Sequence, residues 1–112
     1  MTSHLINANE IIDRLIELGV DWANKNAAAS LLEETKKSLL ATIAEEYAPI
    51  CKHAVDSERK ALKDQRYTGH LEAMTEARKE AHIARVKYDG GNVFADLQRT
   101  NSAMIRAEMG IR

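Results

Sequence analysis

Apolar residues recur every three or four positions through the first half of the chain. A heptad pattern can be placed between residues 11 and 43, and eight of its ten a and d positions are apolar. This spacing is typical of an amphipathic helix, because a strand would alternate at every second residue. The ten positions are Ile11, Leu15, Leu18, Trp22, Lys25, Ala29, Leu32, Lys36, Leu39 and Ile43.

More apolar residues lie beside this stripe and widen it, namely Ile12, Ile16, Val20, Ala28, Leu31 and Leu40. A helix with a wide apolar face has more than one packing neighbour. If it is unbroken, the helix reaches up to about 55 Å at 1.5 Å per residue, which is long for a globule of 112 residues. The pattern therefore predicts an elongated hairpin or an oligomer.

The limits of this first helix follow from capping and helix-breaking residues. Its start can be capped by Thr2 or Ser3, with Asn7 and Asn9 as later alternatives. Pro49 ends it near Ala48, because proline cannot continue the helical hydrogen bonds. We therefore predict a helix over residues 4–47, followed by a minor, charged helix over residues 51–64.

Two features could interrupt the first helix. Gly19 disfavours a helix interior and marks either a kink or a close approach of another helix. The residues from Ser30 to Glu33 fit a capping box, so a break near Asn26 is the alternative to one long helix.

A second stripe begins at Tyr67 and is rich in alanine, which predicts close packing on a neighbouring helix. Its members are Tyr67, His70, Met74, Ala77, Ala81, Ala84 and Tyr88. The run from Asp89 through Gly90 and Gly91 to Asn92 is a turn signal, in which a glycine ends one helix and Asn92 caps the next. The predicted helices are residues 67–89 and 92–109.

The expected fold is all-α: one helical domain over residues 1–112, an elongated helical hairpin or small helical bundle with coiled-coil character, and oligomeric. Its core or oligomer interface is predicted to contain Ile11, Leu15, Leu18, Trp22, Leu32, Leu39, Ile43, Leu71, Met74, Tyr88, Leu97 and Met104.

Charge is unevenly distributed along the chain. Residues 1–58 hold ten acidic and five basic side chains, and residues 59–112 hold seven acidic and eleven basic ones. The favoured interpretation is that antiparallel segments attract each other, within a chain or between subunits. The alternative is that the basic half binds nucleic acid through phosphate contacts. The residues expected to make those contacts are Arg78, Lys79, Arg85, Lys87, Arg99 and Arg106.

The residue types do not form a pattern that predicts catalysis or a cofactor. Cys51 is the one cysteine, so it cannot form a disulfide within the chain, and it favours a reducing, cytoplasmic location. The four histidines lack metal-ligand spacing, and the paired glutamates at residues 33–34 and 45–46 resemble a solvated helix face. We expect no enzyme, no metal, no cofactor and no membrane span.

The last forty residues or so resemble the end of a family of small helical proteins encoded by phages and prophages. The matching segments are Glu76-Ala77-Arg78, Glu80-Ala81, Tyr88-Asp89, Leu97, Arg99-Thr100-Asn101 and Arg106-Ala107-Glu108-Met109, with Leu15–Gly19 a looser match to the family's start. The resemblance implies phage origin, near recombination genes, and a location in the host cytoplasm.

The expected function is therefore protein–protein interaction by a non-enzymatic helical oligomer. The alternatives are a nucleic-acid-binding accessory of phage recombination and an inhibitor of a host defence enzyme.

Overall fold

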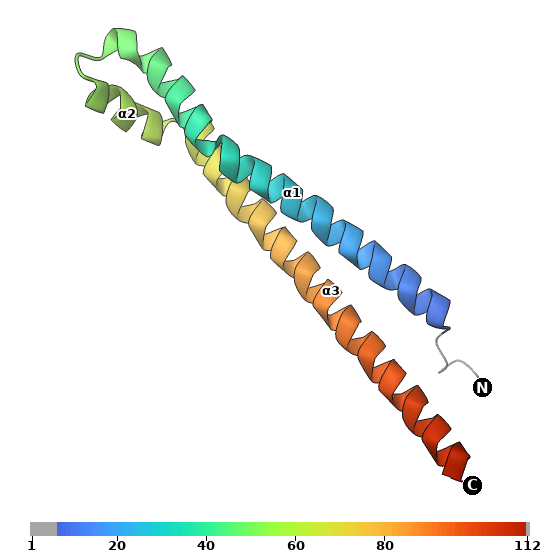
Figure 1. Cartoon of the computed structure of the whole chain (residues 1–112). Coiled ribbons are helices and arrows are strands. Elements are labelled where there is room, and N and C mark those ends of the chain that lie inside the picture. Colours follow the sequence, from blue (N-terminus) through green and yellow to red (C-terminus); the bar gives the residue numbers. More distant parts are fainter. Residues whose placement is uncertain (1–6, 112) are drawn as a thin grey trace. The chain divides into compact units, whose positions relative to one another are not determined.

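The regular structure of the chain is helical throughout the part that the computed structural model describes, residues 7–111. Helix α1 spans Ala8–Tyr47, a 3₁₀ turn spans Ala48–Ile50, α2 spans Ala54–Lys63 and α3 spans Gln65–Ile111 (Figure 1). The all-α prediction is confirmed.

Local sequence explains where α1 begins and ends. The side chain of Asn7 accepts a hydrogen bond from the backbone N–H of Asn9 at 2.9 Å, which satisfies a donor that the first helical turn leaves open. Thr2, Ser3 and the predicted start near residue 4 lie outside the described residues. Pro49 follows the end of α1 closely, as predicted, and lies within the 3₁₀ turn. The alternative break near Asn26 does not occur, because α1 is continuous.

The predicted turn at Gly90 and Gly91 is wrong: α3 continues through both residues as one helix of 47 residues. Among the described glycines none has a positive φ angle, so neither acts as a left-handed cap. Two glycines cost roughly 1 kcal/mol each relative to alanine in a helix interior. Gly91 offsets part of that cost, because its missing side chain leaves room for Leu15 and Leu18 of α1.

Asp64 separates α2 from α3. Its backbone N–H donates to the Ala61 carbonyl, and its own carbonyl accepts hydrogen bonds from Tyr67 and Thr68. One residue therefore caps the end of α2 and the start of α3, which begins two residues earlier than the sequence predicts.

The described residues pack as two units. The three-helix unit comprises residues 24–81 and contains the end of α1, all of α2 and the first part of α3. Its core consists of Ile43, Ala61 and Tyr67, one from each helix. The partly buried residues around that core are Leu39, Leu40, Ala44, Tyr47 and Leu71.

The two-helix unit comprises residues 7–23 of α1 and residues 82–111 of α3. In each unit the two long helices are antiparallel, because residues further along α1 meet residues earlier in α3. In the two-helix unit Leu15 lies against Gly91 and Gly19 against Tyr88. In the three-helix unit Glu33 contacts Arg78, and Glu46 contacts Arg66. Ala81 and Ala84, one in each unit, are each 2% exposed, which agrees with the predicted close packing of the alanine-rich stripe.

Candidate interaction surfaces

An aromatic pair joins α1 to α3 inside the two-helix unit. The rings of Trp22 and Tyr88 stack with their centroids 5.9 Å apart and their planes at 15°. The Tyr88 ring also passes close to Gly19, where a Cβ atom would lie 3.1 Å from Cε1. Gly19 is therefore a point of close approach, one of the two outcomes that the sequence allows. The guanidinium of Arg85 lies 5.8 Å from the Trp22 ring centre, within reach of a cation–π interaction.

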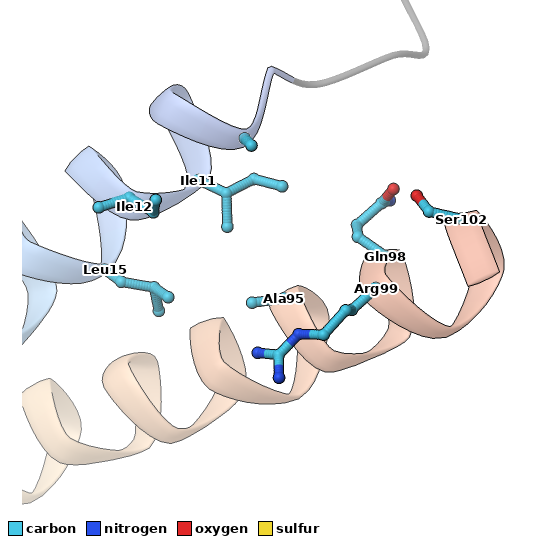
Figure 2. Close-up of a pocket in the computed structure, with 8 residues that line it drawn as sticks. Ile11, Ile12, Leu15, Ala95, Gln98, Arg99 and Ser102 are labelled. Carbon is cyan, nitrogen blue, oxygen red and sulfur yellow. The ribbon is translucent and has the colours of Figure 1, made fainter.

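A groove opens between α1 and α3 in the same unit, with a volume of about 350 Å³. Figure 2 shows Ile11 and Leu15 of α1 projecting toward Ala95 and Gln98 of α3 across this groove. Its other lining residues are Ala8, Ile12, Arg99 and Ser102. The walls are apolar on the α1 side and mixed on the α3 side.

One flank of α1 in the two-helix unit, at the edge of its contact with α3, carries branched apolar residues that are exposed to solvent. Ile12, Ile16 and Val20 are 52%, 58% and 53% exposed. Residues four apart lie on one helix face, so the three form a continuous strip. Leu15 and Gly19 lie in the seam where α1 packs against α3. Ile16 follows Leu15 and Val20 follows Gly19 by one position, which turns each side chain about 100° around the helix from that seam. We call Ile12, Ile16 and Val20 the α1 outer strip.

The outer side of α3 carries a similar set of residues. Val86, Val93 and Leu97 are 70%, 59% and 58% exposed and recur at spacings of seven and four. Val86 lies two positions from both Ala84 and Tyr88, which face α1, so it projects from the opposite side of the helix. We call Val86, Val93 and Leu97 the α3 outer strip.

Most of the predicted interface residues lie inside the chain's own helix contacts. Ile43 is buried, and nine others are partly buried, namely Ile11, Leu15, Leu18, Trp22, Leu32, Leu39, Leu71, Met74 and Tyr88. Leu97 and Met104 are exposed. Every residue from Arg99 to Gly110 is exposed as well, so the end of α3 is uncovered in the described chain.

The six basic residues predicted to contact nucleic acid do not form one free patch. Arg78 contacts three α1 side chains: Nε donates to Glu33 at 2.7 Å, Nη1 to Asn26 at 2.7 Å and Nη2 to Ser30 at 3.3 Å. The bond with Glu33 raises the pKa of Arg78 and holds it charged. Arg78 therefore supports the favoured interpretation of the charge layout, in which acidic and basic segments attract each other.

Three other arginines of the set lie near acidic or carbonyl groups of α3 itself. Arg85 lies 3.8 Å from Asp89, Arg99 lies 3.3 Å from Asp96, and Arg106 donates to the Ser102 carbonyl at 3.4 Å. Lys79 and Lys87 are exposed. These contacts reduce the positive potential that the arginines offer to a phosphate backbone.

A charged network holds the α2–α3 junction against the end of α1. The hydroxyl of Tyr47 donates to Asp64 Oδ2 at 2.8 Å, and the backbone N–H of Arg66 donates to Asp64 Oδ1 at 2.8 Å. The Arg66 guanidinium contacts Asp64 at 3.1 Å and Glu46 at 2.6 Å. The hydrogen bonds from Arg66, and then that from Tyr47, hold the pKa of Asp64 well below its usual range.

One surface that the sequence reasoning missed is the exposed face of α2. A shallow depression of about 430 Å³ is lined by Arg59, Lys60, Lys63 and Asp56 of α2 and by the preceding residues Ile50, Cys51, Lys52 and His53. We call this surface, with the exposed Val55 and Leu62 beside it, the α2 face. Ile50, Val55 and Leu62 are 70%, 62% and 49% exposed. The signal was present in the sequence as basic residues at helical spacing, but the segment lacks a continuous apolar stripe.

One of the four histidines has a structural role between two helices. His70 Nε2–H donates to the Leu32 carbonyl at 2.6 Å, which ties α3 to α1 in the three-helix unit. Within residues 7–111 no group of three or more His, Cys, Asp or Glu side chains could hold a metal ion. Nor does that part of the chain contain a helix long and apolar enough to cross a membrane.

Comparison with protein-family models, with curated proteins and with solved structures finds no match for this chain. A proposal for its function therefore depends on the two outer strips, the α2 face and the charges around them.

Proposed function

We propose that this chain is a non-enzymatic helical protein of phage type that binds another macromolecule as a helical oligomer. The observation that supports this best is the pair of outer strips on α1 and α3. Six branched aliphatic side chains are each more than half exposed and are repeated at helical spacing. Scattered exposed apolar residues are ordinary, but an ordered apolar strip on a helix is typical of an interface.

The energetics favour burial of these strips in an assembly. Removing apolar surface from water contributes about 25 cal/mol for each Å² buried. The helix pair of the two-helix unit already fills its seam with Leu15, Trp22 and Tyr88, and the residues of both strips remain more than half exposed beside that seam. A further helix, from a second copy or from another protein, supplies the missing cover.

The setting that we propose is the cytoplasm of a phage's bacterial host. It follows from the resemblance of the last forty residues to phage and prophage proteins and from the lone thiol of Cys51, which suits a reducing compartment. In this setting the assembly presents its remaining surfaces to a host or phage protein.

Sedimentation velocity and light scattering at micromolar concentrations test the oligomer directly. We expect the wild-type chain to be larger than a monomer and the double variant Ile16→Asp with Val20→Asp to be monomeric, because two carboxylates on the α1 outer strip oppose its burial. The control is Ala73→Asp, which adds a negative charge at an exposed α3 position in the other unit. Circular dichroism checks that each variant keeps its helices. A strictly monomeric wild type contradicts the proposal.

Nucleic-acid binding in phage recombination is the alternative function. The exposed Lys79 and Lys87 favour it, whereas the contacts of Arg78, Arg85 and Arg99 with acidic side chains oppose it. A mobility-shift titration at low and at high salt separates the two functions, because phosphate contacts weaken steeply with salt. A shift at low salt that disappears at high salt, and that Lys79→Glu with Lys87→Glu abolishes, supports the alternative. The absence of any shift at low salt removes it.

A further inference from the structure

The α1 outer strip and the α2 face carry opposite charges, and we propose that they bind each other between two copies of this chain. This inference rests on the proposed function, because it names the surfaces through which the oligomer forms. One copy contributes the start of α1, and a second copy contributes α2.

Acidic residues border the α1 outer strip along one edge. They are Glu10, Asp13, Glu17 and Asp21. Spacings of three and four place the four side chains on one side of the helix, adjacent to Ile12, Ile16 and Val20. Arg14 contacts Glu17 at 3.3 Å, and Lys25 follows Asp21 by four positions. With both of these cations included, this face still has a net negative charge of two.

The α2 face is positively charged, and, like the α1 outer strip, it places its charged residues beside exposed apolar ones. Lys52, Arg59, Lys60 and Lys63 provide four positive charges, and Asp56 is the acidic residue that lines the same depression. The exposed Glu58 of α2 lies beside Val55 and Leu62, so the whole face has a net positive charge of two. The exposed apolar residues Ile50, Val55 and Leu62 lie beside this basic group. The opposite side of α2 is fixed by the buried Ser57 and Ala61, so the basic and apolar side chains remain directed away from the unit's core.

The two faces also match in length. The twelve residues from Glu10 to Asp21 span about 18 Å of helix, and the ten residues of α2 span about 15 Å, at 1.5 Å rise per residue. A pair of helices packed along this length buries both apolar sets and places carboxylates opposite ammonium and guanidinium groups. Complementary charge of this kind fixes the orientation of an interface and excludes wrong partners.

A second copy fits the α2 face better than nucleic acid does. Nucleic acid would neutralise the four cations but would leave Ile50, Val55 and Leu62 exposed, whereas the α1 outer strip covers them. The contact joins two different surfaces, so each copy has one of each to offer, and the assembly either closes or extends. The measured mass shows which of these occurs.

Charge reversal tests the pairing, with association measured by sedimentation and light scattering. The acid-reversed variant carries Asp13→Lys and Glu17→Lys, and the base-reversed variant carries Lys60→Glu and Lys63→Glu. Each variant alone brings like charges together, so we expect its self-association to weaken about tenfold or more. An equimolar mixture of the two restores opposite charges at every contact and should associate as the wild type does. The control, Glu76→Lys with Glu80→Lys, changes the net charge as the acid-reversed variant does but on exposed residues of α3.

Recovery of association in the mixture supports the pairing, because a folding defect in either variant could not be repaired by mixing. If the wild type is an oligomer that neither reversal weakens, the pairing is wrong and the proposed function survives. If the wild type is a monomer, both fail. If the base-reversed variant keeps wild-type self-association but no longer binds a DNA oligonucleotide that the wild type binds, the α2 face binds nucleic acid. That result overturns the pairing.

Discussion

At the residue scale, two adjacent glycines of α3 have different surroundings. A Cβ atom at Gly90 would meet nothing within 4 Å, whereas one at Gly91 would lie 3.0 Å from Leu15 Cδ2 and 3.1 Å from Leu18 Cδ1. Glycine is less favourable than alanine in a helix interior by about 1 kcal/mol. At Gly90 no contact compensates that cost. At Gly91 the absence of a side chain allows Leu15 and Leu18 of α1 to pack closely against α3.

This difference predicts that an alanine substitution has different effects on stability at the two glycines. Gly90→Ala should raise the free energy of unfolding by about 1 kcal/mol, because it adds helix propensity without a clash. Gly91→Ala should give a smaller gain or a loss, since its methyl group forces Leu15 and Leu18 to move. Urea unfolding followed by circular dichroism measures both variants. An equal gain for the two glycines would mean that α1 does not pack against Gly91.

Asp64 links side-chain ionisation to stability. Hydrogen bonds from Arg66 and Tyr47 lower its pKa in the folded chain below the value of about 3.9 for an unperturbed aspartate. The ionised form of Asp64 is therefore favoured more strongly in the folded state than in the unfolded state. The stabilisation is complete above the unfolded pKa and is lost as the pH falls below it toward the folded pKa.

Replacing the Asp64 carboxylate should make folding stability depend less on pH under acidic conditions. Asp64→Asn should lower the melting temperature at pH 7 and should lose less stability than the wild type between pH 4 and pH 2. Asp56→Asn, on the exposed side of α2, serves as the control and should follow the wild-type curve. Thermal melts across that pH range measure all three proteins. A wild-type curve that matches the Asp64→Asn curve would show that the network does not form.

At the scale of whole elements, the sequence predicts what depends on local chemistry. The apolar spacing from Ile11 to Ile43 predicts α1, and Pro49 predicts its end, because both act within a few residues along the chain. The turn at Gly90 and Gly91 was predicted by the same local rules and is wrong, because contacts with α1 from far along the sequence decide that region. Local propensity could not show that Gly91 lies against Leu15 and Leu18.

For the candidate surfaces, too, the sequence predicts the residues that follow local spacing but not the contacts between distant segments. The heptad positions predict the seam residues Leu15, Trp22 and Ile43, which the structure places inside the chain. Spacing alone could not separate residues that cover the neighbouring helix from those that remain exposed, such as Leu97. Nor could it show that Arg78 reaches Glu33, since 45 positions separate the two and only the antiparallel pairing brings them together.

Arg78 provides a test of that pairing between elements. Arg78→Met should lower the melting temperature, because it removes three hydrogen bonds to α1 and deprives Glu33 of its guanidinium partner. Lys79→Met removes the same charge from the next, exposed position and should change stability by no more than about 0.5 kcal/mol. Equal effects of the two substitutions would contradict the structural role of Arg78. Thermal melts and urea titrations of both variants give the comparison.

At the scale of the whole molecule, the acidic first half and basic second half make two kinds of contact. Within the chain, Arg66 contacts Glu46 and Arg78 contacts Glu33, so part of the charge joins α1 to α3. Other charges lie on the acidic edge of the α1 outer strip and on the α2 face. Since both regions also expose branched apolar side chains, the charge layout favours self-association rather than mutual repulsion between copies.

Self-association makes thermal stability depend on protein concentration. A partner that binds only the folded chain stabilises it by mass action, and each tenfold rise in concentration above the dissociation constant contributes up to about 1.4 kcal/mol. We therefore expect the wild-type melting temperature to rise steadily between 1 and 100 µM, measured by circular dichroism at the low end and calorimetry at the high end. The monomeric variant Ile16→Asp with Val20→Asp should melt at one temperature throughout, and Ala73→Asp should behave as the wild type. A wild-type melting temperature independent of concentration would contradict both the proposed oligomer and the pairing of the α1 outer strip with the α2 face.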